Sequence, residues 1–157
     1  TGHLAVQLAK WKGAYVIGTA SARNADFVRK LGADQFIDYT TTRLEDVLDN
    51  IDVAYDTVGQ QTAQQAIKIL NPGGMLVMIA GGQPSAEIQA MAADRGARVQ
   101  GMLVHPDSAA LKQIAALADA GVVKPMLDTV LPLAEARRAH ELGETNRTRG
   151  KIVLAAV

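Results

Sequence analysis

The stretch "GMLVMIAGG" (residues 74–82) is the most hydrophobic strand-like segment of the sequence, and it ends in paired glycines. A continuous apolar run closed by a turn signal is typical of a strand that is buried on both faces. Such strands occur in parallel sheets that are covered by helices on either side. The stretch therefore predicts a parallel α/β sheet.

Segments of the same kind alternate with helical patterns along the rest of the chain. Further strands are predicted at residues 15–21, 34–39, 51–59, 97–104, 128–133 and 150–157. Helices are predicted at residues 1–10, 25–32, 41–50, 61–74, 108–121 and 134–144. Because this alternation builds right-handed βαβ units, it predicts a doubly wound domain with helices on both faces of the sheet.

Single residues predict where some of these helices begin and end. Gly32 is expected to stop one helix at its C-terminus. Thr41 or Thr42 is expected to cap the N-terminus of the next. Residues 71–74, Asn-Pro-Gly-Gly, are expected to break the helix that precedes the strand at 74–82.

Composition narrows the class of protein. The 157 residues suit one domain, and 48% apolar and 20% charged residues describe an ordinary globular chain. Sixteen basic and sixteen acidic residues cancel, so neither nucleic acid nor an anionic membrane surface is an expected partner. The apolar runs are shorter than the ~20 residues of a membrane helix, and no signal-peptide pattern opens the chain. We therefore expect a cytoplasmic protein.

Several kinds of catalytic centre are disfavoured by the residue types present. The chain has no cysteine, which excludes a disulfide framework, cysteine-ligated zinc and a thiol nucleophile. His3, His105 and His140 lie on separate predicted elements, so we expect surface or capping histidines and no metal site. No Gly-x-Ser-x-Gly elbow is present, which argues against an α/β-hydrolase. No catalytic residue is assigned.

Glycines cluster directly after the predicted strands. Gly59 follows "DTV", and Gly81 and Gly82 follow "MIA". These positions are the carboxyl ends of parallel strands, where doubly wound sheets bind their ligands.

Five blocks of sequence follow one another in the order seen in medium-chain dehydrogenase/reductases. They are "TGHLAVQLAK" (1–10), "VIGTAS…FVRKLGADQFIDY" (16–39), "DTVGQQT" (56–62), "LNPGGMLVMIAGG" (70–82) and "RGKIVLAAV" (149–157). Together they resemble the zinc-free, quinone-oxidoreductase-like branch over essentially the whole chain. The resemblance implies a Rossmann-type domain that binds NADPH, and hydride transfer to a quinone or an activated alkene or carbonyl. It also implies a small-molecule substrate and a separate, mainly N-terminal domain that supplies much of the substrate pocket.

The resemblance also implies that the nucleotide-binding domain, residues 1–127, lacks its first strand. Residues 128–157 would return to the catalytic domain, which is absent from this chain. In a sheet of order 3-2-1-4-5-6, the missing strand would lie between the strands at 15–21 and 51–59, leaving two facing unpaired edges. Two hypotheses follow: the chain is a fragment of a longer reductase, or a complementing upstream segment or a partner chain in a homo-oligomer fills the slot.

Cofactor-binding residues are inferred from the same resemblance. Gly2 corresponds to the last glycine of the phosphate loop. Arg149, Gly150 and Lys151 are expected to approach the cofactor phosphates, although a loop with surface charges would have the same sequence. Tyr39 is expected to flank the 2′-phosphate of NADPH. The residues expected beside the nicotinamide half are Thr57, Val58, Gly59, Ala80, Gly81 and Leu103.

The end of the strand at 15–21 bears on the choice of nucleotide. An NAD-binding domain carries Asp or Glu about 20 residues past its glycines, where it accepts a hydrogen bond from the ribose 2′-hydroxyl. Here residues 18–23 read Gly-Thr-Ala-Ser-Ala-Arg, without an acid. A hydroxyl and a guanidinium can bind a 2′-phosphate through charge-assisted hydrogen bonds. Ser21 and Arg23 therefore favour NADPH, although a helix-capping Ser21 and a solvated Arg23 would have the same sequence.

Two other functions remain open. The chain could be a truncated nucleotide-fold module without catalytic activity, because half of the phosphate loop is missing. A methyltransferase that uses S-adenosylmethionine is also doubly wound, but it would require an acid near residues 20–23. Within the reductases, quinone and enoyl reductases are not distinguished, because the absent domain would select the substrate.

Overall fold

The computed structural model describes residues 1–145 and 147–156 and divides into two compact units. One unit is formed by residues 15–108. The other combines residues 1–14 with the chain from residue 109 onward. These units are defined by internal contacts, and the functional division at residue 128 stays a prediction.

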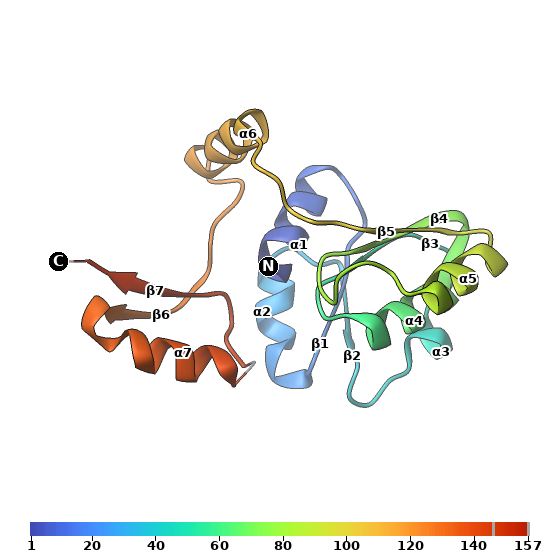
Figure 1. Ribbon diagram of the computed structural model, residues 1–157, viewed down its shortest axis with the longest axis horizontal. Coiled ribbons are helices and arrows are strands. Elements are labelled where there is room, and N and C mark those ends of the chain that lie inside the picture. The colour runs from blue at the N-terminus through green and yellow to red at the C-terminus, as the bar shows by residue number, and fades with distance from the viewer. Residues whose placement is uncertain (146, 157) are drawn as a thin grey trace. The chain divides into compact units, whose positions relative to one another are not determined.

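The unit of residues 15–108 contains five short parallel strands (Figure 1). Strand β1 (Ile17–Ala20) pairs with β2 (Gln35–Asp38). Strands β3 (Ile51–Asp56), β4 (Leu70–Met78) and β5 (Arg98–Gly101) form a second parallel sheet in that order. The parallel α/β architecture predicted from the apolar runs is thus confirmed.

The two sheets of this unit are not joined by a strand. Each of β1 and β3 has a single pairing partner among the residues that the structure describes. One edge of each strand therefore carries no ladder hydrogen bonds, at the two edges expected to be open. The unpaired N–H and C=O groups of such an edge are able to pair with a further strand. The source of such a strand stays a hypothesis.

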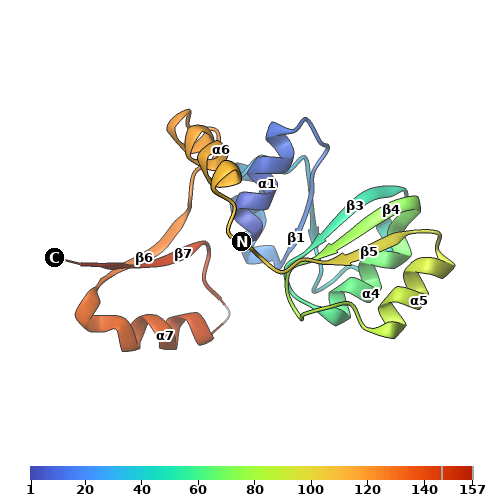
Figure 2. The same cartoon turned by 45° about the horizontal axis from the view of Figure 1, so that its top comes forward.

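Helices α4 (Gln60–Ile69) and α5 (Ala86–Asp94) pack together against the three-stranded sheet (Figure 2). They bury small and branched side chains against one face of β3, β4 and β5. This core consists of Ala63, Ala66, Ile67, Leu70, Leu76, Met78, Ile88, Ala92 and Ala97. It fixes the strands whose carboxyl ends carry the candidate site.

Helix α2 (Ala25–Lys30) lies against β1 and β2 and ends as the sequence predicts. Gly32 follows its last turn with a φ of 103°, a left-handed conformation that favours glycine. At Gly18, a side-chain carbon would collide with Val28 of this helix. The absence of a side chain at Gly18 therefore lets α2 approach β1 closely.

The prediction for residues 41–50 is largely wrong. Helix α3 spans only Leu44–Val47, and Arg43 rather than a threonine occupies the N-cap position. The backbone N–H groups of Thr41 and Thr42 donate to the carbonyl oxygen of Asp38. Both threonines are therefore part of the turn that follows β2, which competes with helix formation.

Two further differences concern residues 70–96. Helix α4 ends at Ile69, and β4 begins at Leu70, so the Asn-Pro-Gly-Gly segment belongs to an irregular strand. The N–H of Gly73 donates to the Gly96 carbonyl at 2.7 Å, which holds this segment beside the chain that follows α5. Helix α5 itself was not predicted. Ser85 caps it by accepting the Ile88 N–H at 3.3 Å.

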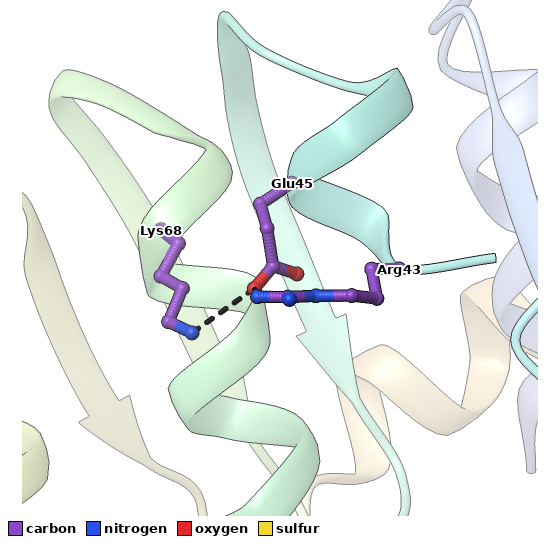
Figure 3. A network of polar contacts seen from close by, with 3 residues as sticks. All are labelled: Arg43, Glu45 and Lys68. Atoms are coloured by element: carbon purple, nitrogen blue, oxygen red, sulfur yellow. Dashed lines mark hydrogen bonds and ion pairs between the residues drawn. The ribbon is translucent and has the colours of Figure 1, made fainter.

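An ion-pair network ties α3 to α4 (Figure 3). Oε1 of Glu45 lies 2.7 Å from Nη2 of Arg43 and 3.0 Å from Nζ of Lys68 on α4. The Glu45 side chain is only 20% exposed. Hydrogen bonds, that from Arg43 above all, lower the pKa of Glu45 to about 2. The carboxylate is therefore charged at neutral pH and holds two cations from separate elements.

This network predicts an acid-dependent loss of stability. Because folding lowers the pKa of Glu45 from 4.5 to about 2, its contribution is complete above pH 4.5 and is lost as the pH falls toward about 2. Glu45→Gln should lower the thermal midpoint at neutral pH. The difference in midpoint between the variant and wild type should become smaller as the pH falls through that range. Thermal unfolding monitored by circular dichroism measures both. Glu87→Gln, at an exposed glutamate on α5, should keep the wild-type profile; a constant gap for Glu45→Gln would contradict the prediction.

The other unit contains α1 (Gly2–Trp11), β6 (Leu127–Pro132), α7 (Ala136–Glu144) and β7 (Lys151–Ala155), with α6 (Ser108–Asp119) entering it from residue 109. Strands β6 and β7 pair in parallel with each other, and α7 packs against them. Their expected return to another domain stays a prediction, and the last residue of the predicted strand, 157, lies outside the described residues.

The Gln7 side chain of helix α1 forms two hydrogen bonds with the backbone of the segment after α6. The Gln7 amide donates to the Lys124 carbonyl at 3.0 Å, and its oxygen accepts the Lys124 N–H at 2.8 Å. Across residues 1–145 and 147–156, no helix combines the length and apolar character needed to cross a membrane.

Candidate functional site

The start of α1 is the first group of candidate residues. Gly2 begins the helix, and a side-chain carbon there would meet no atom within 4 Å. His3 follows it and is only 6% exposed, so the expectation of a surface or capping histidine is wrong at this position. His3 Nε2 is buried and has no hydrogen-bond partner in the described part of the chain. His105 and His140 are exposed, as expected.

Lys151 lies close to this helix start. Burial is the main cause that lowers the pKa of His3, and the positive charge of Lys151 lowers it further. The imidazole is therefore neutral at neutral pH. The structure thus places the charge of Lys151 near the start of α1, which begins at Gly2.

The second group lies at the carboxyl ends of β1 and β2. Ala20 and Asp38 are opposite each other in the parallel register, so Ser21 and Tyr39 follow at the same edge. The Tyr39 N–H donates to the Ala20 carbonyl at 3.4 Å. Ser21 takes the N-cap position of a short 3-10 helix, Ala22–Asn24, but its hydroxyl makes no capping bond. Its oxygen instead accepts from the Asn24 amide at 3.4 Å.

Arg23 is part of that 3-10 helix, and Tyr39 presents an exposed ring beyond β2. The structure therefore places Ser21, Arg23 and Tyr39 at one edge of the β1–β2 pair. A hydroxyl, a guanidinium and a phenol at such an edge can bind an anion through hydrogen bonds.

A carboxylate at this edge was missed by the sequence analysis. Asp38 Oδ1 accepts the Thr40 N–H at 2.9 Å and the Thr40 hydroxyl at 2.6 Å. These hydrogen bonds lower the pKa of Asp38. The Asp38 carboxylate thus accepts hydrogen bonds within the turn that follows β2. An Asp two residues before a Thr is a sequence pattern that can indicate such a turn.

The third group begins with the loop after β3. Thr57, Val58 and Gly59 follow Asp56, whose side chain is buried and only 7% exposed. Asp56 Oδ1 accepts the Val58 N–H at 3.1 Å, and Oδ2 accepts the Gly59 N–H at 3.0 Å. The buried carboxylate therefore fixes the loop through two backbone N–H groups, while the Val58 side chain is exposed.

The loop after β4, with Ala80 and Gly81, lies against the first. A side-chain carbon on Gly81 would be 3.3 Å from the Gly59 Cα, and Gly81 has a φ of 79°. The two loops therefore meet through bare backbone. Such a surface lets a flat ligand approach the backbone closely.

Gln60 links the same two loops. Its side-chain nitrogen donates to the carbonyl oxygens of Gly81 at 3.5 Å and Gln83 at 3.3 Å. Its side-chain oxygen is buried and has no partner among the described residues. The sequence analysis assigned no role to Gln60.

Leu103 stands beyond the end of β5. The Met102 N–H donates to the Met78 carbonyl at 2.8 Å, which continues the pairing of β5 with β4. Leu103 follows with 81% of its surface exposed. The six residues expected beside a nicotinamide thus all lie at the carboxyl edge of the β3–β4–β5 sheet. Among residues 1–145 and 147–156, no cluster of three His, Asp or Glu side chains is arranged to hold a metal ion.

Comparison with known proteins identifies relatives over most of the chain. Residues 31–154 match the family model of zinc-binding dehydrogenases. The chain is 32% identical to an NADPH-dependent alkenal/one oxidoreductase of Arabidopsis thaliana chloroplasts and 31% identical to a 2-methylene-furan-3-one reductase of Solanum lycopersicum. Each alignment covers 98% of this chain and 37% of the relative.

A solved quinone oxidoreductase from Coxiella burnetii has the same fold. It superimposes with a TM-score of 0.89 at 34% identity, over 99% of this chain and 49% of that one. The chain therefore spans about half the length, or less, of the relatives it matches. The family-model match, the parallel sheets and these relatives lead to one conclusion: the chain belongs to the zinc-binding dehydrogenase family of the medium-chain dehydrogenase/reductases.

Proposed function

We propose that this chain is the NADPH-binding part of an oxidoreductase that transfers hydride to a quinone or to an activated alkene or carbonyl. The observation that carries the proposal is the backbone contact between Gly59 and Gly81 at the carboxyl ends of β3 and β4. Relatives named as an NADPH-dependent oxidoreductase and as a quinone oxidoreductase support it.

The residues at this edge fit the nicotinamide half of the cofactor. Gly59 and Gly81 present backbone without side chains, and a Cβ on Gly81 would lie only 3.3 Å from the Gly59 Cα. Thr57, Val58, Ala80 and Leu103 would surround the ring, exclude water and fix its orientation. When bound, the nicotinamide supplies the hydride, so the chain needs no nucleophile of its own.

Two separate groups of residues are proposed for the phosphates of the cofactor. Ser21, Arg23 and Tyr39 would bind the 2′-phosphate, because they offer two hydroxyl groups and a guanidinium at one strand edge. Gly2 and Lys151 would bind the pyrophosphate through helix amides and a positive charge. The role of each residue is part of the proposal.

We extend the proposal to zinc and to cellular location. The chain has no cysteine, so we propose that residues 1–157 supply no thiolate ligand to such a metal. A cytoplasmic location stays a prediction, since the Arabidopsis relative is named as chloroplastic. A small-molecule substrate and a possible homo-oligomer likewise stay predictions.

A non-catalytic nucleotide-binding module is the second candidate. The open edges of β1 and β3 favour it, because a sheet interrupted beside the cofactor edge would position the ligand poorly. Such a module would bind the nucleotide without turning over any substrate. The methyltransferase alternative loses its support, because the matched relatives are oxidoreductases.

Arg23→Ala tests the choice of nucleotide. The variant should bind NADPH roughly 10–100-fold more weakly, the value of a hydrogen bond to a charged group, and should bind NADH as wild type does. Isothermal titration with both nucleotides measures the difference. Arg29→Ala, at an exposed arginine of α2 beside Asp26, is the control and should change neither affinity. Equal losses for NADPH and NADH would remove the proposed role of Arg23.

The reaction itself is tested by restoring a full-length reductase. A chimera would carry the N-terminal part of the C. burnetii quinone oxidoreductase ahead of Thr1. We expect it to oxidise NADPH in the presence of a quinone or an α,β-unsaturated ketone. The loss of NADPH absorbance measures this reaction. A folded chimera that binds NADPH but reduces neither substrate would favour the non-catalytic module.

A further inference from the structure

We propose that Asp56 and Thr62 are positioning residues that set the Thr57–Gly59 loop for the nicotinamide half of the cofactor. The inference rests on the proposed function and deepens it. It assigns a role to two residues that touch the loop from beneath and lie outside the cofactor-binding set derived above.

Asp56 uses both of its carboxylate oxygens on this loop. Oδ1 accepts from the Val58 N–H at 3.1 Å and from the Thr62 hydroxyl at 2.6 Å, while Oδ2 accepts from the Gly59 N–H at 3.0 Å. A buried carboxylate is costly unless such donors surround it. The three donors therefore explain how an acid is tolerated at the end of β3. They also fix two consecutive peptide groups of the loop.

Gly59 is held on both sides. Its N–H is bonded to Asp56, and its carbonyl oxygen accepts the Ala63 N–H at 3.1 Å and lies 2.8 Å from the Thr62 hydroxyl. Because glycine has the widest conformational freedom, an unrestrained Gly59 would sample many backbone conformations. The Asp56–Thr62 pair selects the one with a φ of 139°.

The second loop takes its position from the first. The Ile79 N–H donates to the Asp56 carbonyl at 3.0 Å, and Gln60 bonds the carbonyls of Gly81 and Gln83. A shift of Gly59 would therefore disturb its contact with Gly81. The side chain of Asp56 thus controls the bare backbone surface that both loops form.

Asp56 also determines which chemical group this edge accepts. Its carboxylate lies at the N-terminus of α4, the positive end of that helix, and takes the N–H of the N-cap residue Gly59. A helix start that already holds an anion does not attract a second one. The edge therefore suits an uncharged ring and ribose rather than a phosphate group.

The experiment compares two ligands that differ by the nicotinamide mononucleotide half. NADPH and adenosine 2′,5′-bisphosphate would be titrated calorimetrically into the 157-residue chain, and into the chimera if the chain alone binds too weakly. Asp56→Asn should weaken NADPH about tenfold or more, the usual effect of losing a charged acceptor, and leave adenosine 2′,5′-bisphosphate unchanged. A purely structural role would weaken both ligands alike or neither.

A matched pair of substitutions keeps the test decisive if Asp56→Asn fails to fold. Thr62→Val keeps the side-chain shape but removes the hydroxyl, whereas Thr62→Ser retains the hydroxyl. We expect Thr62→Val to weaken NADPH selectively and Thr62→Ser to bind as wild type does. Asp52→Asn, at an exposed acid on the same strand, is the control and should change neither affinity.

The possible outcomes distinguish the positioning role of Asp56 and Thr62 from the proposed function. Equal NADPH affinity of Thr62→Val and Thr62→Ser, or parallel losses for both ligands in Asp56→Asn, would overturn the positioning role while leaving the proposed function intact. Wild-type protein that binds neither ligand, as chain or as chimera, would overturn the proposed function and this inference together.

Discussion

Gly81→Ala is expected to weaken NADPH binding by roughly tenfold, because small displacements at a reacting centre have large effects. The new Cβ would lie 3.3 Å from the Cα of Gly59 and 3.6 Å from the backbone nitrogen of Gln60. Both neighbours are backbone atoms, so the loops themselves must separate by a few tenths of an ångström. The left-handed φ of 79° adds about 1–2 kcal/mol of strain to the folded state.

Gly82→Ala provides the matched control for this prediction. Gly82 has a φ of 78°, almost the same as Gly81, but a Cβ there would meet no atom within 4 Å. The strain from φ should therefore be similar in both variants, Gly81→Ala should lose more stability in thermal unfolding, and only Gly81→Ala should lose affinity in a calorimetric titration. Equal affinities of the two variants would show that the Gly59–Gly81 contact does not shape the site.

Gly150→Ala is expected to destabilise the unit of α1, α7, β6 and β7 by about 3 kcal/mol or more, the range of a severe backbone clash. An added Cβ would collide with the carbonyl of Met126. That carbonyl accepts the Lys151 N–H at 2.8 Å, the bond that starts the pairing of β6 with β7. The φ of 120° at Gly150 leaves an alanine no relaxed alternative.

The control for Gly150 lies in the same unit. Gly143 is inside α7, and a Cβ there would meet nothing within 4 Å. Gly143→Ala should therefore stabilise the helix by roughly 0.5–1 kcal/mol. Amide hydrogen exchange of β6 and β7 measures both changes. Unaltered protection of these strands in Gly150→Ala would contradict the prediction.

The strands were predictable because continuous apolar runs closed by turn residues are typical of strands in parallel sheets. In the structure, α4 and α5 cover one face of the β3–β4–β5 sheet, whereas Val53 and Tyr55 of β3 are exposed, and the glycines after the apolar runs mark the carboxyl ends. The open edges at β1 and β3 followed from the strand order that the resemblance implies. The parallel fold could thus be predicted from hydrophobicity and spacing, and the open strand edges from the family resemblance.

Helices α3 and α5 were difficult for the opposite reason. Helix α5 buries only Ile88 and Ala92, so its sequence shows no broad apolar stripe. Helix α3 has four residues and is held by the ion pairs of Glu45, which depend on a lysine 23 positions away. Its expected threonine caps are engaged by Asp38 instead. Contacts between distant residues decided both elements.

The sequence predicted the glycines exposed at the candidate site but not the buried side chain that supports them. Gly59 and Gly81 follow strands in the sequence, so their place at the sheet edge could be predicted. Asp56 resembles any acid at a strand end, and only its three donors reveal its role. His3 was expected at the surface because nothing in a single helical turn shows what later segments cover it.

Calorimetric titration of NADPH tests the central claim most directly. It would be carried out on the 157-residue chain and on the chimera with the N-terminal part of the C. burnetii quinone oxidoreductase. The proposed function predicts saturable binding of NADPH, stronger than that of NADH, in at least the chimera, with a loss of that preference in Arg23→Ala. A folded chimera and a folded chain that both fail to bind NADPH would contradict the account.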